Sequence, residues 1–246
     1  MIALIRAVLF DLGGTLMYSR APWEPIFERG YQALVDSLCD QGITLDCKEL
    51  PRVVQYHLDR YFARRDKDLH ETTYITVLHE LLAEHGHRNV DNQTIRRALD
   101  AFYAHTQPNW LLEEDALLTL RTLEAGGYRL GLVSNAGDDQ DVFQLVERFH
   151  IEPFFDFILT SAACSYRKPH PRIFQLALAH WNIPPGEIAM VGDSLGADIL
   201  GAQKLNIYGV WITRRVSRSP ARHKIQPDAE VQTLHEIPAL LSHLSV

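Results

Sequence analysis

The sequence predicts an α/β fold, a doubly wound parallel sheet whose first strand is followed by an inserted set of helices. Three observations predict it. The continuous apolar run from Ala7 to Phe10 is typical of a strand buried on both faces of a sheet. Residues 18–108 show helical periodicity and no convincing buried strand. From Glu113 onward, helical and strand patterns alternate, which implies right-handed crossovers and a parallel sheet.

Composition limits the class of protein. The chain has 246 residues, 46% of them hydrophobic, which is enough for one large α/β domain or a core with a smaller insertion. Its net charge of -7 gives no support to a nucleic-acid or anionic-membrane partner. The run from Ile2 to Phe10 is too short to span a bilayer and lacks a signal-peptide cleavage site. We therefore expect a soluble cytoplasmic protein, either a monomer or a homodimer.

The three cysteines are odd in number and have no CxxC spacing. Cys39, Cys47 and Cys164 are therefore expected to be free thiols in a reducing compartment.

Four amphipathic helices are expected in the insertion. They are a helix over Trp23 to Asp40, one with Pro51 in its first turn, one over Glu71 to His85 that stops at Gly86, and one over Asp91 to His105 that ends at Pro108. The simplest architecture is a Rossmann-like core domain of residues 1–17 and 109–246, with a helical cap domain of residues 18–108 inserted after the first strand.

The remaining elements of the core follow in order. Helices are expected over Glu113 to Ala125, Asp139 to Phe149, Pro171 to Trp181 and Ala197 to Leu205, and strands over Tyr128 to Val133, Phe157 to Thr160, Glu187 to Val191, Ile207 to Ile212 and Glu230-Val231. Acidic residues in the first turn of the helix at Glu113 suit the helix dipole. The acidic run Asp138, Asp139 and Asp141 is interpreted as a helix cap and first turn rather than a metal cluster.

Polar residues follow several of the predicted strands. The four stretches are Asp11-Leu-Gly-Gly-Thr15, Ser134-Asn135, Lys168-Pro169 and Gly192-Asp193-Ser-Leu-Gly-Ala-Asp198. In a parallel sheet they can meet along one edge, where ligands of open α/β sheets bind. Together they supply carboxylates, hydroxyl and amide donors and one ammonium, a set that suits Mg²⁺ and a phosphoryl group.

In the order and spacing of these four stretches the sequence resembles the haloacid dehalogenase-like hydrolases, and the inserted helices resemble their cap. The resemblance implies that Asp11 is a nucleophile that forms an aspartyl-phosphate. It implies that Asp11, the carbonyl of Gly13, Asp193 and Asp198 hold Mg²⁺, with Asp198 as a direct or indirect ligand. It further implies that Thr15, Ser134 and the amide of Asn135 bind a small phosphorylated substrate, and that Lys168 neutralises charge beside Asp11.

One position departs from the family pattern. The phosphatases of the family carry an Asp acid/base two residues after the nucleophile, and here that residue is Gly13. Losing a positioned acid/base typically costs about 10²- to 10⁴-fold in rate. Three readings stay open: a phosphatase in which water or another group substitutes, an impaired relative that binds a phosphorylated ligand, and a phosphonate- or halide-cleaving member. In the first of these readings, the group that replaces the missing Asp could be Tyr18, Arg20, His57 or His70.

A basic segment follows the strand at Ile207 to Ile212. It contains Arg214, Arg215, Arg218, Arg222, His223 and Lys224. Because no aromatic residue interleaves these charges, a solvated loop is favoured over a nucleic-acid site. Such a loop could also rim the substrate pocket. Trp110, Trp181 and Trp211 are interpreted as packing residues.

Overall fold

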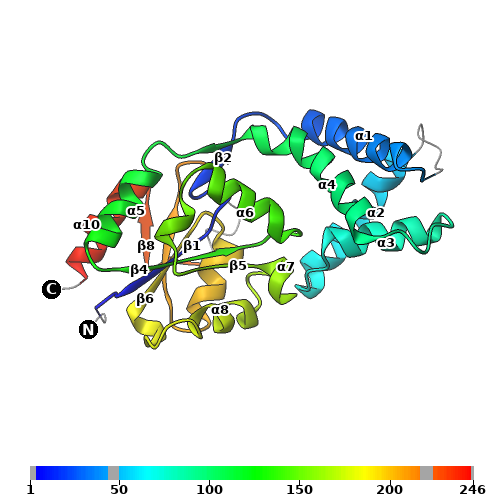
Figure 1. Cartoon of the computed structure of the whole chain (residues 1–246). Helices are drawn as coiled ribbons and strands as arrows, with labels where there is room; N and C mark the ends of the chain where they lie inside the picture. Colours follow the sequence, from blue (N-terminus) through cyan, green and yellow to red (C-terminus); the bar gives the residue numbers. More distant parts are fainter. Residues whose placement is uncertain (1–3, 44–49, 217–223, 245–246) are drawn as a thin grey trace. The chain divides into compact units, whose positions relative to one another are not determined.

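The computed structural model describes residues 4–43, 50–216 and 224–244, and the chain forms two compact units. The sheet unit comprises Met1–Tyr18 and Leu112–Val246, and the helical unit comprises Ser19–Leu111 (Figure 1). The chain passes between the units through two short strands, β2 (Met17–Ser19) and β3 (Trp110–Leu112), which pair in a two-stranded sheet. No described helix is both long enough and apolar enough to cross a membrane.

A six-stranded parallel sheet forms the middle of the sheet unit, which confirms the predicted fold class. Its strand order is β5-β4-β1-β6-β7-β8, and all neighbouring strands are parallel. The strands are β1 (Ala7–Phe10), β4 (Arg129–Ser134), β5 (Phe157–Thr160), β6 (Ile188–Gly192), β7 (Tyr208–Ile212) and β8 (Ala229–Val231). Every residue of the central strand β1 is buried, as its apolar sequence predicts.

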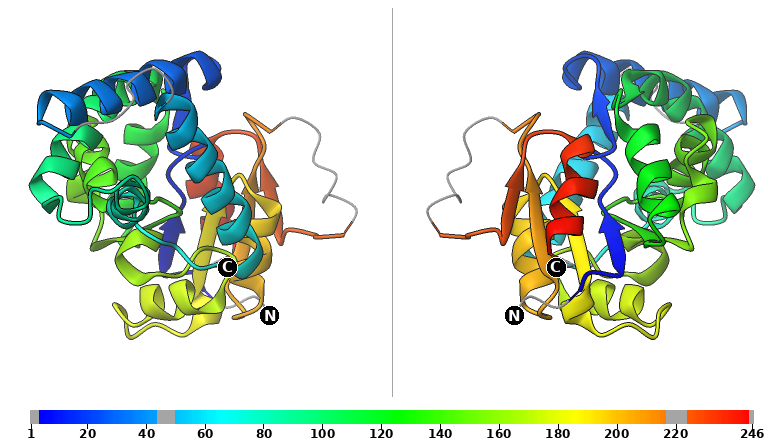
Figure 2. Two further views of the ribbon diagram at one scale, coloured as in Figure 1. Left: turned by 90° about the vertical axis from the view of Figure 1, so that its right-hand side faces the viewer. Right: turned by 90° about the vertical axis from the view of Figure 1, so that its left-hand side faces the viewer.

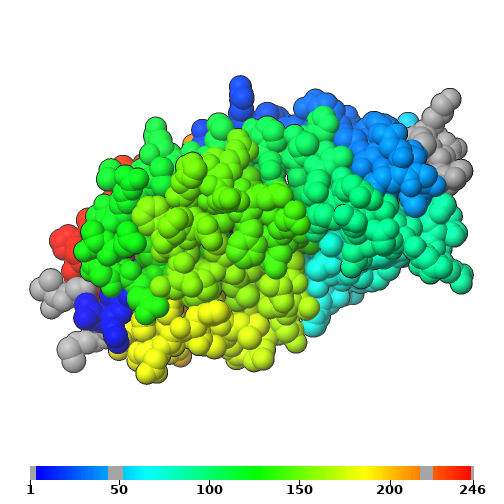
Figure 3. All heavy atoms as spheres, viewed as in Figure 1, coloured from blue at the N-terminus to red at the C-terminus, as the bar shows by residue number. Residues whose placement is uncertain are grey.

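Helices cover both faces of this sheet (Figure 2). The helices are α5 (Ala116–Ala125), α6 (Asp139–Arg148), α7 (Ser161–Cys164), α8 (Pro171–Leu178), α9 (Leu200–Gln203) and α10 (Ile237–His243), with short helical turns η2 (Glu152–Phe154), η3 (Pro185–Glu187), η4 (Leu195–Ile199) and η6 (Leu234–Glu236). Ala7 and Leu9 of β1 pack in one core cluster with Phe174 of α8 and Ala202 of α9. Val8 and Phe10 therefore point to the opposite face. In the space-filling view, the visible face of the sheet unit is formed mainly by residues coloured green to yellow, the colours of α5, α6 and α8 (Figure 3).

The helix predicted from Glu113 begins three residues later, at Ala116, so the acidic first turn was a wrong prediction. Glu113 instead lies beside the segment through which the chain leaves the sheet unit. Its amide donates a hydrogen bond to the carbonyl of Leu16 in that segment at 2.9 Å. Asp115 occupies the N-cap position of α5 without capping it through its side chain. The two carboxylates have other partners.

Those partners are Arg214 and Arg215, which come directly after β7. Arg214 donates to Asp115 at 2.8 and 2.9 Å and to Glu113 at 2.8 Å, and Arg215 donates two further bonds to Glu113 at 2.8 and 3.0 Å. The Arg215 guanidinium also lies 3.8 Å from the centre of the Tyr18 ring. Burial acts to raise the pKa of Asp115, but the hydrogen bonds from Arg214 and from the His235 amide outweigh it and lower that pKa. The prediction of a solvated basic loop is therefore wrong at Arg214, whose paired side chain is 17% exposed, whereas Arg215 is paired but remains exposed. Arg218, Arg222 and His223 lie outside the described residues.

The helical unit contains α1 (Glu24–Asp40), α2 (Leu50–Asp68), α3 (Tyr74–Glu84), α4 (Asn92–Thr106) and the turn η1 (Gln107–Asn109). Side chains cap two of these helices at their N-termini. Thr73 accepts from the amide of Thr76, and Asp91 accepts from the amide of Thr94. The apolar faces of the helices meet in a core of their own. The helices predicted from periodicity are confirmed to within a few residues, whereas the role of this unit as a cap stays a prediction.

The cysteines only partly agree with expectation. Cys39 is disulfide-bonded, so the prediction of a free thiol is wrong at this residue. Cys164 is not part of a disulfide, as predicted, and its Sγ donates to the carbonyl of Tyr166 at 3.4 Å. Cys47 lies outside the described residues. Cysteine spacing by itself could not reveal the bond, because pairing depends on how the chain folds.

Candidate active site

Three of the four polar stretches lie at the carboxyl ends of the neighbouring strands β4, β1 and β6. Asp11 follows β1 directly, and its amide donates to the carbonyl of Val191 in β6 at 2.9 Å. Ser134 is the last residue of β4, and Asp193 follows β6. Lys168 comes from the loop between α7 and α8. The topology therefore brings together residues that are 157 positions apart in the case of Asp11 and Lys168.

Lys168 is the best-connected side chain of this site, and it is only 1% exposed. Its Nζ donates to Asp11 Oδ1 at 2.6 Å and to the carbonyl of Val133 at 2.7 Å, and lies 2.7 Å from Asp198 Oδ1. Burial acts to lower the pKa of Lys168, but attraction to Asp11 and Asp198 outweighs it and raises that pKa. Lys168 is therefore held as a cation between two carboxylates.

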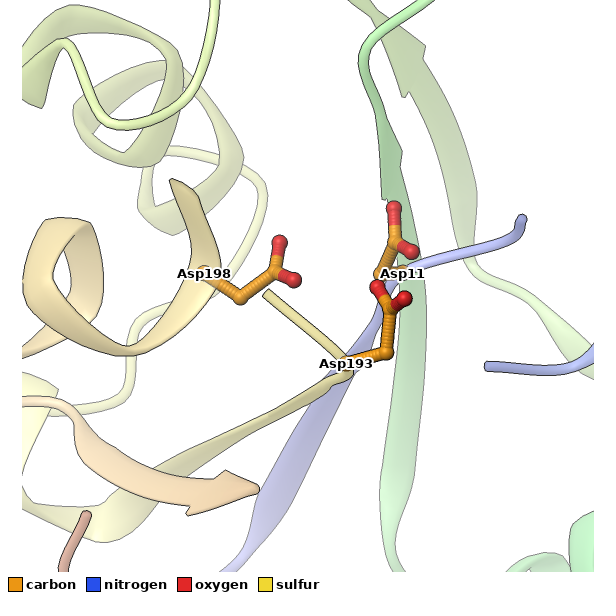
Figure 4. A group of neighbouring side chains, drawn as sticks. All are labelled: Asp11, Asp193 and Asp198. Carbon is orange, nitrogen blue, oxygen red and sulfur yellow. The ribbon is translucent and has the colours of Figure 1, made fainter. Parts of the chain in front are cut away.

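Three carboxylates converge at the same place. Asp11, Asp193 and Asp198 each offer an oxygen within 4.8 Å of the others, and their side chains face one another (Figure 4). Burial and then repulsion from Asp11 and Asp198 raise the pKa of Asp193 to about 7. Burial raises the pKa of Asp198 to about 6, although Lys168 acts in the opposite direction. The single ammonium of Lys168 therefore neutralises only part of the negative charge of the three carboxylates.

Two glycines allow this close approach. A Cβ at Gly14 would lie 2.3 Å from Asp193 Oδ2, and Gly14 also has a φ of +85°, which favours glycine. A Cβ at Gly192 would lie 2.3 Å from Asp198 Oδ2. The glycines of the first and last polar stretches therefore leave room for carboxylates.

Asp198 is held by its own loop. It lies in the π-helical turn η4, and its Oδ2 accepts a hydrogen bond from the amide of Ser194 at 3.0 Å. Ser194 Oγ accepts from the amide of Ala197 at 3.1 Å, which caps the turn. The turn starts two residues before the predicted helix and places Asp198 inside the cluster.

The other residues predicted for the site are Thr15, Ser134, Asn135 and Gly13. Thr15 Oγ1 donates to Asp11 Oδ2 at 3.3 Å, and Ser134 is buried at the end of β4. The Asn135 side chain accepts from the Lys168 amide at 2.8 Å and donates to the Lys168 carbonyl at 3.0 Å. Gly13 forms an isolated bridge with Met17. Substrate binding by Thr15, Ser134 and Asn135 and metal binding by Gly13 stay predictions.

The hydrogen bonds made by two side chains at the site, those of Asn135 and Trp211, could not be predicted from the sequence. The side chain of Asn135 fixes the backbone of Lys168, whereas the prediction concerned only the Asn135 amide. Trp211 is a buried packing residue, as predicted, and its indole N–H also donates to the backbone carbonyl of Asp193 at 2.8 Å. Both depend on strand register, which residue types do not reveal.

The donor set fits a hard divalent cation. Mg²⁺ prefers carboxylate and carbonyl oxygens and is usually bound through a few of them. Three crowded carboxylates, two of them with raised pKa values, supply oxygen ligands and an excess of negative charge. The cluster at Asp11, Asp193 and Asp198 is therefore a candidate magnesium site.

The raised pKa values of Asp193 and Asp198 are expected to make the free energy of unfolding depend on pH. Because the pKa values of Asp193 and Asp198 are raised to about 7 and about 6, the metal-free fold binds protons more tightly than the unfolded chain. Their stabilising contribution is present at low pH and is lost as pH rises through these values. In EDTA, we expect the melting temperature to fall as pH rises from about 5 to about 8.

Thermal unfolding with and without Mg²⁺ checks this expectation. Because a cation binds the ionised carboxylates, the rise in melting temperature caused by Mg²⁺ should grow over the same pH range. The Asp193→Asn variant should lose the part of both effects centred near pH 7 and keep the part near pH 6 that belongs to Asp198. An unchanged pH dependence in that variant would contradict the assignment to Asp193.

Comparison with known proteins agrees with this geometry. The family model described as haloacid dehalogenase-like hydrolase matches residues 5–206. The glyceraldehyde 3-phosphate phosphatase of Pyrococcus furiosus is 34% identical over 110 residues, which cover 44% of this chain and 45% of that protein. The chain thus spans less than half of this relative. The glyceraldehyde 3-phosphate phosphatase of Methanothermobacter thermautotrophicus is 25% identical over 239 residues, 96% of this chain and 98% of that protein.

A solved structure is similar over nearly the whole chain. The crystal structure of a HAD phosphatase from Thermococcus onnurineus has a TM-score of 0.69 and 25% identity, and the match covers 98% of this chain and all of that one. The resemblance inferred from the four polar stretches is thereby confirmed.

Proposed function

Because the chain belongs to the haloacid dehalogenase-like hydrolases, we propose that it hydrolyses a small phosphorylated metabolite through an aspartyl-phosphate at Asp11. The observation that carries the proposal is the contact of Asp11 with Lys168 at 2.6 Å beside Asp193 and Asp198. A carboxylate, a fixed cation and a cluster of oxygen ligands are what transfer of a phosphoryl group to an aspartate requires.

The two oxygens of Asp11 differ in how they are held. Oδ1 receives the 2.6 Å bond from Lys168, whereas Oδ2 receives only a 3.3 Å bond from Thr15. We assign the attack on phosphorus to Oδ2, since it is the less engaged oxygen. The Oδ2–P bond forms as the bond from phosphorus to the leaving oxygen breaks, and the leaving oxygen takes a proton from water, because Gly13 has none to give. A water molecule then attacks phosphorus, the Oδ2–P bond breaks, and phosphate is released with the Asp11 carboxylate restored.

Lys168 supplies charge rather than a proton in this proposal. Its three short contacts and raised pKa keep it an ammonium throughout turnover. It orients Asp11 and neutralises charge that develops on the phosphoryl oxygens. Bound Mg²⁺ would be held by Asp11 and Asp193, with Asp198 nearby, and would add positive charge next to the phosphoryl group.

The names of the relatives suggest a substrate class. Two of them are glyceraldehyde 3-phosphate phosphatases, so small phosphorylated sugars are the first candidates. The test is phosphate release by the full chain from glyceraldehyde 3-phosphate and a panel of small sugar phosphates, with Mg²⁺ and with EDTA. We expect Mg²⁺-dependent release from at least one of them. Absence of release from the whole panel would contradict the proposal.

Gly13 favours a second candidate function. A glycine cannot donate a proton to the leaving group or take one from water, so a site that binds Mg²⁺ and a phosphorylated ligand without turnover is the alternative. This alternative predicts Mg²⁺-dependent binding of sugar phosphates by calorimetry with no phosphate release. A measurement of phosphate release therefore distinguishes the two candidate functions.

A further inference from the structure

Trp211 lies in β7 next to the loop that carries Asp193 and Asp198. It pairs in register with Gly192, the last residue of β6, and is 2% exposed. Its indole N–H donates to the backbone carbonyl of Asp193 at 2.8 Å. The loop between Asp193 and Asp198 is therefore tied to the neighbouring strand at its first residue.

The same side chain also holds the far end of this loop. Trp211 forms an apolar cluster with Leu195 and Ile199, the first and last residues of the turn η4. Ile199 also packs against β7 closely, since a Cβ at Gly209 would lie 2.9 Å from Ile199 Cγ2. Asp198 directly precedes Ile199, so its position follows from this packing.

The loop needs such support because its carboxylates repel one another. Asp193 and Asp198 lie within 4.8 Å of each other and of Asp11. Without a metal ion, Lys168 balances only part of this negative charge, and repulsion favours a wider spacing of the Asp193 and Asp198 side chains. A rigid indole that both hydrogen-bonds the backbone at Asp193 and packs on the residues around Asp198 opposes that spreading.

We propose that Trp211 is a positioning residue that presets the separation of Asp193 and Asp198 for a divalent cation. The inference rests on the proposed function, because it takes these aspartates as ligands of Mg²⁺. Supporting groups behind metal ligands typically change metal affinity by about 10- to 100-fold when they are removed. Trp211 reaches Asp193 through its backbone, so it acts on geometry rather than on carboxylate charge.

The test compares two tryptophans of the sheet unit. Trp211→Phe removes the indole N–H and keeps an aromatic ring in the cluster. Trp181→Phe is the matched control, since Trp181 is also buried and donates its N–H at 2.9 Å, but to Asp156. The dissociation constant of Mg²⁺ is measured on each full chain by calorimetry, below the melting temperature recorded in EDTA.

We expect Trp211→Phe to weaken Mg²⁺ binding by about 10-fold or more, and Trp181→Phe to leave it within about twofold of wild type. Equal Mg²⁺ affinity in all three proteins, or equal loss in both variants, would overturn the inference. Failure of the wild-type chain itself to bind Mg²⁺ would instead overturn the metal site of the proposed function, and the inference with it.

A second variant covers the case in which Trp211→Phe does not fold. Ile199→Val removes Cδ1, which would lie 3.6 Å from a Cβ at Gly209, and keeps the indole N–H that Trp211 donates to the carbonyl of Asp193. It is expected to weaken Mg²⁺ binding in the same direction by a smaller factor. An unchanged affinity would contradict the role given to the packing.

Discussion

Asp11→Asn is expected to reduce Mg²⁺-dependent phosphate release to background, a loss of roughly 10⁶-fold if it is comparable to the loss of other covalent nucleophiles. The amide is nearly the same size as the carboxylate but cannot form the acyl-phosphate. Lys168 keeps Asp198 as an ionic partner at 2.7 Å, so the variant should remain folded. Release is measured with the best substrate of the panel.

The control for this variant is Asp156→Asn. Asp156 pairs with Arg129 at 2.6 Å and accepts from Trp181, and it lies before β5 rather than after a strand. Its replacement should leave the turnover rate within about twofold of wild type. If Asp11→Asn retains turnover while remaining Mg²⁺-dependent, Asp11 is not the nucleophile.

Gly13→Asp is expected to raise turnover by about 10²- to 10⁴-fold, equivalent to roughly 3 to 5 kcal/mol of activation free energy. The variant supplies a carboxyl group that can protonate the leaving oxygen and then activate water. The gain should be larger for alkyl phosphates than for aryl phosphates, because an alcohol needs a proton more than a phenol, whose pKa is about 10. The ratio of the two rates is measured in both proteins.

Gly13→Asn is the matched control, because it adds a side chain of the same size that transfers no proton. We expect no gain from it with either substrate. If Gly13→Asp is folded and binds Mg²⁺ yet gains nothing, then either another group already performs proton transfer or the site is built for binding. Equal wild-type rates with alkyl and aryl phosphates favour the first explanation, and absence of phosphate release from both favours the second.

The convergence of Asp11, Lys168 and Asp193 was predictable, because parallel strands bring their carboxyl ends to one edge whatever the loops between them. Other features depend on partners far along the chain. Glu113 and Asp115 fit the start of a helix by local rules, but Arg214 lies 99 residues after Asp115 and binds its carboxylate. A sequence shows which side chains are charged, but it does not show which of them form an ion pair in the folded protein.

The roles of Asn135 and Trp211 were beyond sequence reasoning for a different reason. Asn135 uses its side chain on the backbone of Lys168, and Trp211 uses its N–H on the backbone of Asp193. Backbone acceptors are the same at every residue, so their use leaves no pattern of residue types. Only the register of β6 with β7 and the path of the Lys168 loop determine them.

The hydrogen bond from Glu113 to Leu16 means that the polypeptide leaves the sheet and rejoins it at neighbouring points. When the points at which a chain leaves and re-enters a domain are adjacent, the domain tolerates replacement or loss of the segment inserted between them. Residues 19–111 can thus be exchanged as a module in evolution while the residues of the candidate site stay in place in the sheet unit.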